Sequence, residues 1–555
     1  MVRATFSGFN TALSALQANQ KRLDITGQNL SNMNTAGYTR QQLEASSLNY
    51  TNPVSHYSNG NEIAVGFGVS MDRVSQIRDP YLDIQYRSQS ADCSYTNRLQ
   101  TALNSLSKVL DETTISGIRQ AFDDIQSTLT SMQDPAKVSD PIYESELRTK
   151  MQSVCNLFNQ ASRQISQAEQ NEFQRLTGEG SSEQGDVQKI NDILRQIGDL
   201  NVQIKRNQVA GHPSLELQDE RNLLLDELSG YIPVETRYYK DDAHSGNNAY
   251  DYDANGAVIG KKDWPDDLEV SMNYIDAQGK SQKLILVNGS DLGADGLTKN
   301  YGQLSMLKGD HQTAASVSDP ANISIKFEKA PSYQVNGQAA ADVYAELKGI
   351  HFEGGSLQAS LDMLQKKGTG NVINGSVDDV RGYQYYSEKL DQLADTFAKS
   401  MNASNNGNNH KDQNLLSNST DDSTNGITAG NIGISKGWTS GTIHISTDGT
   451  NRTDTILDMI AAMKDTKKLN GKTFADYMNN LSTQLASDSS SNQTALKTGT
   501  TVLNSIQDSR DSLSGVSLDE EATNMMAYVS AYNAASRLMT ALDEVLNTLI
   551  SNTGA

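Results

Sequence analysis

The segment from Gly515 to Ile550 constrains the fold more than any other part of this sequence. After Gly515 it contains neither Gly nor Pro, and Ser517 and Glu520 have the spacing of a capping box at a helix start. Its apolar residues recur at steps of three and four, with one slip. This pattern predicts one long helix with a coiled-coil seam on one side. The seam comprises Leu518, Met525, Val529, Tyr532, Met539, Leu542, Leu546 and Leu549.

The first thirty residues carry a second seam, interrupted only by Gln20 and Gly27. A helix with one apolar side needs a partner, and the charges of the two ends are opposite, net positive at the N-terminus and net negative at the C-terminus. We therefore expect the terminal helices to pair, with Leu518, Met525, Leu542 and Leu546 facing Phe9, Leu13, Leu16 and Leu23. The complete N-terminal seam is Phe6, Phe9, Leu13, Leu16, Leu23 and Leu30.

A polar motif, NLSNMNTAGYTRQ, follows the first predicted helix from Asn29 to Gln41. Asn and Gly tolerate the left-handed backbone that ends helices, which explains the turn but not the residues after it. The motif resembles the N-terminal signature of flagellar rod, hook and hook-associated proteins, and its GYTRQ ending is typical of the hook-associated branch. GVSLDEE with the helix after it resembles the C-terminal signature of the same family. The motif residues are Asn29, Asn32, Asn34, Thr35, Gly37, Tyr38, Thr39, Arg40 and Gln41.

The resemblance implies a structural protein that joins hook to filament by self-assembly through its terminal helices. It implies as partners other copies of the chain in a ring or helical layer, the hook protein, and a second junction protein on the filament side. It also implies a cytoplasmic export chaperone, which we expect to bind the C-terminal seam from Met525 to Leu549. Within the family, the alternative is a hook or distal-rod protein.

The resemblance further implies passage through the type III flagellar export apparatus to an extracellular flagellum, after transient residence in the cytoplasm. The start of the sequence has no continuous apolar run of the kind found in cleaved secretory signals, and no run is long enough to span a membrane. Isolated subunits are expected to have disordered ends that fold on assembly, because each terminal helix has only one apolar side.

Between the terminal segments, the periodicity predicts a mainly α fold with a β insert, divided between long helices and one β-rich region. Narrow apolar stripes predict a bundle of long helices, and alternating residues such as Leu268 to Tyr274, Ile323 to Phe327 and Val343 to Leu347 predict strands. The expected division is a coiled-coil domain in residues 1–50 and 515–555, a helical bundle in 51–230, 351–402 and 456–514, a β-rich insert in 231–350 and a polar lobe in 403–455.

No pattern of residues indicates catalysis, a cofactor or a metal ion, so we expect no enzyme. Asp251 to Gly256 resembles the first half of a calcium loop, but Lys262 occupies the position of the bidentate acid. The seven His are scattered, and Cys93 and Cys155 have no ligand spacing. A formal net charge of −21 excludes a general nucleic-acid binder. An adhesive or enzymatic module within the β insert remains a minor alternative.

Overall fold

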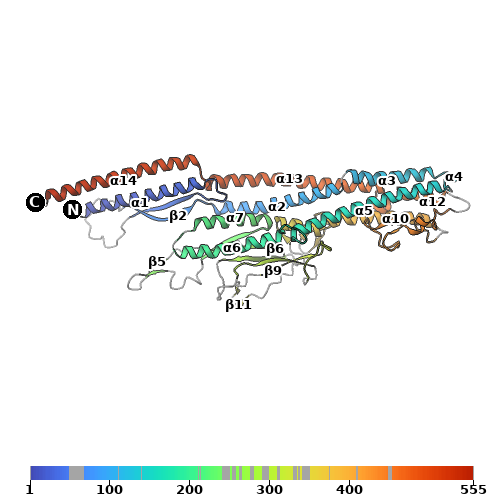
Figure 1. The fold of residues 1–555 in the computed structure, drawn as a ribbon, viewed down its shortest axis with the longest axis horizontal. Coiled ribbons are helices and arrows are strands. Elements are labelled where there is room, and N and C mark those ends of the chain that lie inside the picture. The colour runs from blue at the N-terminus through green and yellow to red at the C-terminus, as the bar shows by residue number, and fades with distance from the viewer. Residues whose placement is uncertain are drawn as a thin grey trace.

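The computed structural model describes residues 2–48, 68–110, 112–138, 140–210, 212, 214–240, 250–252, 258–261, 266–275, 280–289, 299–308, 313–328, 334–335, 338–339, 351–373, 376–407, 411–447 and 453–553. The expected strand from Val343 to Leu347 lies outside these residues. The described molecule is elongated, with both termini at one end (Figure 1). It is mainly helical with small sheets, which confirms the expected fold class.

The helices are α1 (Val2–Asn32), α2 (Pro80–Val109), α3 (Glu112–Ser131), α4 (Pro135–Val138), α5 (Pro141–Thr177), α6 (Asp186–Val209), α7 (Leu215–Tyr231), α9 (Gly355–Gln365), α10 (Tyr383–Asn406), α11 (Lys436–Ser440), α12 (Asp454–Lys464), η3 (Lys467–Leu469), α13 (Phe474–Ser514) and α14 (Leu518–Thr553). The strands are β1 (Gln41–Ser47), β2 (Val69–Gln76), β3 (Glu235–Lys240), β4 (Tyr250–Tyr252), β5 (Val258–Lys261), β6 (Asp266–Ile275), β7 (Ser281–Asn288), β8 (Gln303–Lys308), β9 (Ile323–Glu328), β10 (Gln334–Val335), β11 (Gln338–Ala339), β12 (His351–Phe352), β13 (Val372–Ile373), β14 (Ser376–Val377), β15 (Leu416–Asn418) and β16 (Ile432–Ile434).

Local sequence explains where the long helices begin and end. Asp79 and Asp140 each precede a proline, and their side chains accept hydrogen bonds from the backbone N–H groups of Tyr81 and Ile142. Proline suits the first helical position, because the N–H group of a residue there has no acceptor within the helix and its absence loses no hydrogen bond. Helix α5 ends at Gly178, whose φ of 76° is the left-handed conformation that a glycine adopts without strain.

Helices α2, α3, α5, α10, α12 and α13 form the elongated bundle, in which residues distant in sequence share one core (Figure 1). Phe122, Phe158, Phe397 and Phe474 pack together in this core, with ring centroids 5.2–6.0 Å apart. Aromatic pairs at this spacing add to the free energy gained from burial alone. The short strands β15 and β16 pair antiparallel and pack against α5 and α10.

Most strands lie along one side of the bundle, beside α6 and α7 (Figure 1). The largest described sheet is antiparallel, with β6 between β3 and β7 and with β12 on the end of β6. Leu268, Val270 and Met272 occupy alternate positions of β6, which places them on one face of the sheet, and all three are completely buried. These residues belong to the same continuous core as the bundle.

Helices α1 and α14 extend beyond the bundle as an antiparallel pair (Figure 1). The hairpin of β1 and β2 packs against α1. We call α1, β1, β2 and α14 the terminal unit. Among the described elements, α14 packs chiefly on α1, so the terminal unit meets the bundle mainly where the chain crosses between them.

Candidate functional site

The contact between α1 and α14 is the first part of the candidate site. Leu542 lies against Gly8, with 3.3 Å between its Cδ1 and the position that a Cβ of Gly8 would take. The guanidinium of Arg22 lies 5.6 Å from the ring centroid of Tyr528, a cation–π geometry. Ala12 and Thr26, on the same side of α1, are buried. Helix α1 therefore meets α14 through small and polar residues, which let the two helices approach closely.

Of the expected seam of α1, Leu13 does not lie in this contact. Leu13 is 47% exposed, and Phe9, Leu16, Leu23 and Leu30 are only partly buried. The fully buried side of α1 comprises Ala12, Ala18, Asn19, Ile25, Thr26 and Asn29. This corrects the expected position of Leu13, whereas the pairing of Phe9, Leu16 and Leu23 with α14 stays a prediction. The physical reason is that the hairpin and α14 both pack on the side of α1 that carries its small residues, which leaves Leu13 outward.

The expected seam of α14 is divided between contact and exposure. Met525, Met539, Leu542 and Leu546 are partly buried, and Ala535 between them is buried. Leu518, Val529, Tyr532 and Leu549 are exposed to 55%, 43%, 37% and 52% of their surface. The expectation that Leu518 faces α1 is therefore wrong, because buried Glu521 occupies the first turn instead. The side chain of Phe6 lies outside the described residues.

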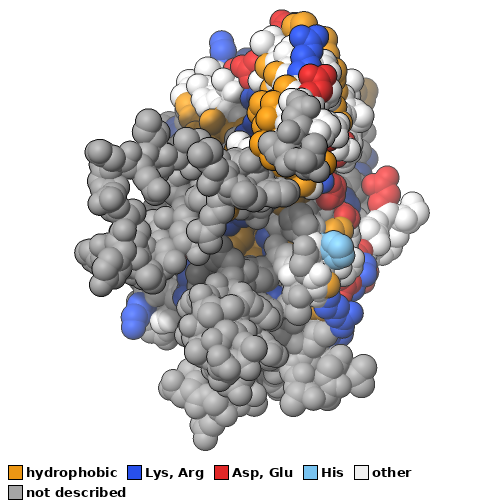
Figure 2. Space-filling view, turned by 90° about the vertical axis from the view of Figure 1, so that its left-hand side faces the viewer, with side chains coloured by type: hydrophobic (Ala, Val, Ile, Leu, Met, Phe, Trp, Pro, Cys, Tyr) orange, Lys and Arg blue, Asp and Glu red, His pale blue; other side chains and the backbone are white. Residues whose placement is uncertain are grey.

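Hydrophobic side chains consequently gather on the outside of the terminal unit. Figure 2 looks onto the end that carries the termini and shows them over the terminal helices. On α14 they include Met526, Leu538, Val545 and Ile550, which are 48–66% exposed. A monomeric protein rarely exposes apolar residues in such continuity, so this surface has the character of an interface.

The polar motif after α1 forms the second part of the site. The side chain of Asn29 is buried and closes a small network: its Nδ2 donates to the carbonyl oxygen of Gln41, and its Oδ1 accepts from the Gln41 N–H and the Tyr38 hydroxyl, all at 2.9–3.0 Å. Burial raises the pKa of Tyr38 above its usual range, so its hydroxyl stays a donor. Asn29 thereby joins the end of α1 to the start of β1.

The remaining motif residues divide into a turn and two anchors. Asn32, Asn34 and Thr35 lie in an exposed or half-exposed turn, where the Thr35 hydroxyl donates to Asn32 Oδ1 at 3.2 Å. Gly37 has a φ of 78°, a left-handed conformation that disfavours other residues. The motif therefore acts as a shaped connector, and its contacts to the rest of the chain come from the residues after Gly37.

Thr39 anchors the motif to the bundle through Asp219 of α7. The Asp219 carboxylate accepts from the Thr39 hydroxyl at 2.6 Å and from the Thr39 N–H at 3.1 Å. Burial of Asp219 raises its pKa to about 6, although Thr39 and Arg78 act in the opposite direction. Beside it, Gln41 Nε2 donates to Glu216 Oε1 at 3.4 Å. Asp219 and Thr39 are both almost fully buried, so this anchor is shielded from water.

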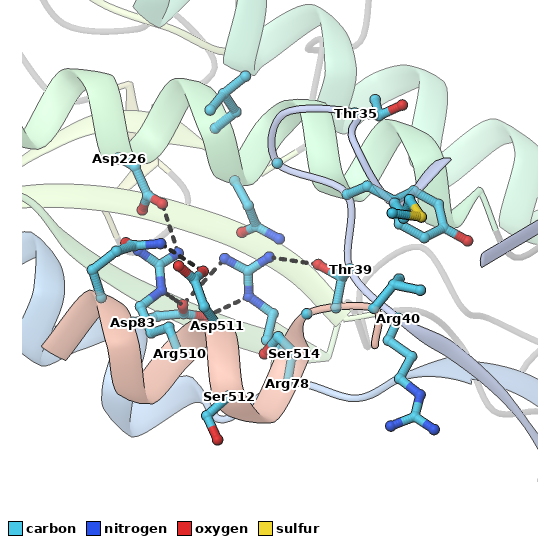
Figure 3. Close-up of a pocket in the computed structure, with 18 of the residues that line it drawn as sticks. Thr35, Thr39, Arg40, Arg78, Asp83, Asp226, Arg510, Asp511, Ser512 and Ser514 are labelled. Carbon is cyan, nitrogen blue, oxygen red and sulfur yellow. Dashed lines mark hydrogen bonds and ion pairs between the residues drawn. The ribbon is translucent and has the colours of Figure 1, made fainter. Parts of the chain in front are cut away.

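An ion-pair network continues from this anchor into the bundle (Figure 3). Arg78 donates to both oxygens of Asp83, and Arg510 of α13 contacts Asp83 Oδ1 at 3.1 Å and Asp226 Oδ2 at 2.7 Å. Arg87 completes the chain with a hydrogen bond to Asp226 Oδ1 at 2.8 Å. Arg78, Asp83, Asp226 and Arg510 line a groove of about 830 Å³ where the terminal unit meets the bundle. We call this region the joint.

Sequence reasoning singled out the motif but not its partners in the bundle. A signal was present in α7, where Asp219, Asn222 and Asp226 follow Leu215 at steps of four and three. Polar residues at the core positions of a helix indicate a buried polar contact. Arg78 and Arg510 carried no such pattern, because their partners lie on other elements.

The described residues show no other candidate for chemistry. His, Cys, Asp and Glu in this part of the chain form no group of three or more that could hold a metal ion. In the segment that resembles a calcium loop, residues 253–257 and 262 lie outside the described part of the chain. Cys93 and Cys155 are free and buried, and burial raises the pKa of Cys155 to about 12. No helix among the described residues has the length and apolarity needed to cross a membrane.

Three family models match the chain. The model of the flagellar hook-associated protein FlgK helical domain matches residues 103–416, which is more than half of the chain. The flagella basal body rod protein model matches residues 9–39, and the model of the flagellar basal body rod FlgEFG protein C-terminal region matches residues 509–552. The last two cover most of the terminal helices and motif.

Named relatives agree with these matches. Flagellar hook-associated protein 1 of Bacillus subtilis (strain 168) is 29% identical over 568 residues, covering 99% of each chain. The protein of the same name from Salmonella typhimurium is 29% identical over 230 residues, covering 41% of this chain and 38% of that one. The solved hook junction protein FlgK from Burkholderia pseudomallei aligns with 18% identity over 60% of this chain and 44% of that chain, at a TM-score of 0.37.

Proposed function

Since the chain belongs to the family of the flagellar hook-associated protein FlgK, it is a structural protein of the flagellar hook-filament junction, and we propose that its terminal unit is the part that assembles. The helical-domain match favours this role over the alternative of a hook or distal-rod protein. We propose no catalytic role for any part of the chain, including the β insert.

The observation that carries the proposal is the apolar surface of the terminal unit. Leu13 on α1 is 47% exposed, and exposed apolar residues flank the contact on α14. Burying such side chains between subunits stabilises an assembly by about 1.5 to 3 kcal/mol for each one fully covered. In our proposal, copies of the chain cover one another's terminal units in a ring or helical layer, between the hook protein and a second junction protein.

Substitution of the outward Leu13 tests this proposal. Leu13→Ser should reduce incorporation into isolated flagella, because an apolar side chain that is 47% exposed in the subunit is lost from the assembling surface, while the bundle remains folded. Gln17→Ser, at an exposed position of the same helix, is the matched control. Fluorescently labelled subunits should lie between hook and filament for the wild type and the control. Normal incorporation of the leucine variant would contradict the proposal.

The same apolar residues support a proposed route to the flagellum. We place the site of a cytoplasmic export chaperone on α14, around Met525 to Leu549, because an amphipathic helix can lie in an apolar groove until assembly. The type III flagellar export apparatus would then carry the chain outside the cell. A chain without residues 516–555 should lose binding to the chaperone in pull-down and calorimetric assays. Undiminished binding would place the chaperone site elsewhere.

A further inference from the structure

We propose that Arg40 is the positioning residue of the terminal unit: it fixes the direction in which α14, and with it α1, leaves the bundle. The inference rests on the proposed function, because the direction of the terminal unit decides which apolar surface the next subunit meets. Arg40 belongs to the motif, yet its partners lie 480 and 481 residues further along the chain.

The backbone of Arg40 lies where three segments of the chain cross. Its N–H donates to the carbonyl oxygen of Ser514, the last residue of α13, at 2.9 Å. Its carbonyl oxygen accepts from the N–H of Ile77, between β2 and α2, at 2.8 Å. Arg40 is therefore attached to both segments that pass between the terminal unit and the bundle.

The side chain of Arg40 holds the first turn of α14. Its Nη1 lies 2.7 Å from Glu520 Oε2, and its Nε lies 2.8 Å from Glu521 Oε1. The Glu521 side chain is only 3% exposed, whereas that of Glu520 is 62% exposed. A buried carboxylate without a partner is costly, so Glu521 requires Arg40 at this place. The planar guanidinium addresses two carboxylates at once, which a lysine ammonium cannot do with fixed geometry.

The side chain of the neighbouring residue, Thr39, points toward the bundle. In extended backbone successive side chains point to opposite sides. Here Thr39 reaches Asp219 in the bundle while Arg40 reaches α14 (Figure 3 shows the two residues side by side). Two adjacent residues of the motif thus connect the bundle to the C-terminal helix.

Among the described residues, no apolar core sets the direction of α14 at the joint. Helices α13 and α14 are separated only by Gly515, Val516 and Ser517, and α14 packs chiefly on α1 among the described elements. The groove at the joint is lined mostly by polar and charged residues. Hydrogen bonds and ion pairs have defined directions, unlike apolar contacts, so they can set an angle between two bodies.

The experiment compares variants in a host that lacks its own copy of the chain. Arg40→Ala should reduce incorporation into flagella at least about tenfold, because Glu521 is left unpaired. Arg40→Lys should restore only part of it. Glu520→Gln should cause a smaller loss, and the double variant Arg40→Ala with Glu520→Gln should be no worse than Arg40→Ala alone, since both changes break one interaction. Export into the medium and the main unfolding temperature of the purified full-length chain, which reports on the bundle, should not change.

Two controls separate position from charge. Asp519→Asn removes an acid from the same helical turn that makes no pair with Arg40, and Arg73→Ala breaks the exposed pair of Arg73 with Glu44 at 2.7 Å. Both should be incorporated like the wild type. If Arg40→Ala is not exported, Glu520→Gln tests the role of Arg40 in its place, because Glu520 is exposed and its substitution should leave the fold intact.

Three results would overturn the inference. The first is wild-type incorporation of Arg40→Ala or, if that variant is not exported, wild-type incorporation of Glu520→Gln. The second is a double variant whose loss of incorporation equals the sum of the two single losses, and the third is a bundle destabilised by Arg40→Ala. The leucine variant of α1 distinguishes a failure of the inference on Arg40 from a failure of the proposed function. If it is excluded from flagella while Arg40→Ala enters, only the role of Arg40 is wrong. If both enter normally, the proposed assembly surface is wrong as well.

Discussion

Asp219 shows at the scale of a residue how the joint depends on protonation. Because burial raises its pKa to about 6, the folded chain binds this proton more tightly than the unfolded chain does. Stability from this group is therefore greatest at low pH and is lost as the pH rises through about 6. From about pH 7.5 to about pH 5.3, the free energy of unfolding should increase by about 1 kcal/mol in the wild type relative to Asp219→Asn, which cannot titrate.

Urea titrations at a series of pH values measure this difference. The range stops above the sequence pI of about 4.8, where the chain loses its net charge and solubility falls. Asp519→Asn is the control for the loss of one carboxylate at an exposed position. A constant difference between wild type and Asp219→Asn across the range would show that Asp219 does not titrate in the joint.

At the scale of elements, the side of α1 that faces α14 can be read by crosslinking. Because Gly8 lies against Leu542, the pair Gly8→Cys and Leu542→Cys should form a disulfide on mild oxidation of assembled flagella. Leu13→Cys with Leu542→Cys should not form one within a subunit, since Leu13 points outward. Gel mobility under non-reducing conditions measures both.

The native cysteines do not interfere with this assay, because Cys93 and Cys155 are buried in the bundle. Mixing subunits that each carry one cysteine separates bonds within a subunit from bonds between subunits. If Leu13→Cys crosslinks within the subunit as efficiently as Gly8→Cys, the leucine side of α1 faces α14 after all.

At the scale of the whole molecule, the bundle and the terminal unit differ in how they are stabilised. Helix α5 alone buries Leu147, Met151, Val154 and Phe158 completely, whereas Glu521 and Ala535 are the only buried residues among the described side chains of α14. Local stability follows the density of buried contacts, so the ends should open first. In the isolated subunit, amides from Phe9 to Leu30 and from Leu518 to Leu549 should exchange at nearly random-coil rates, while those from Leu99 to Ile204 stay protected.

Hydrogen exchange with mass spectrometry on a verified monomer checks this expectation. Exchange on assembled flagella is the comparison, where the same terminal amides should become protected as neighbouring subunits cover them. Strong protection of both ends in the monomer would mean that α1 and α14 stabilise each other without neighbours.

Periodicity and capping are local, so the sequence alone predicts the type of the main helices and strands. The three-four spacing predicts the long helices, Ser517 and Glu520 mark the start of α14, and alternation in Leu268 to Tyr274 predicts β6. The opposite charges and apolar stripes at the two ends also pointed to contact between α1 and α14. The resemblance of the Asn29 to Gln41 motif pointed to the family.

Only the tertiary structure decided which side of each helix is covered. Leu13 and Ala12 are neighbours in sequence, and spacing favoured Leu13 for the contact, yet Ala12 is buried because α14 and the hairpin both approach the small residues. Likewise, nothing near Arg40 or Thr39 in sequence identifies Glu521 or Asp219 as a partner. Such contacts depend on where distant elements meet, and a directional hydrogen bond or ion pair exists only once the fold has brought its two ends together.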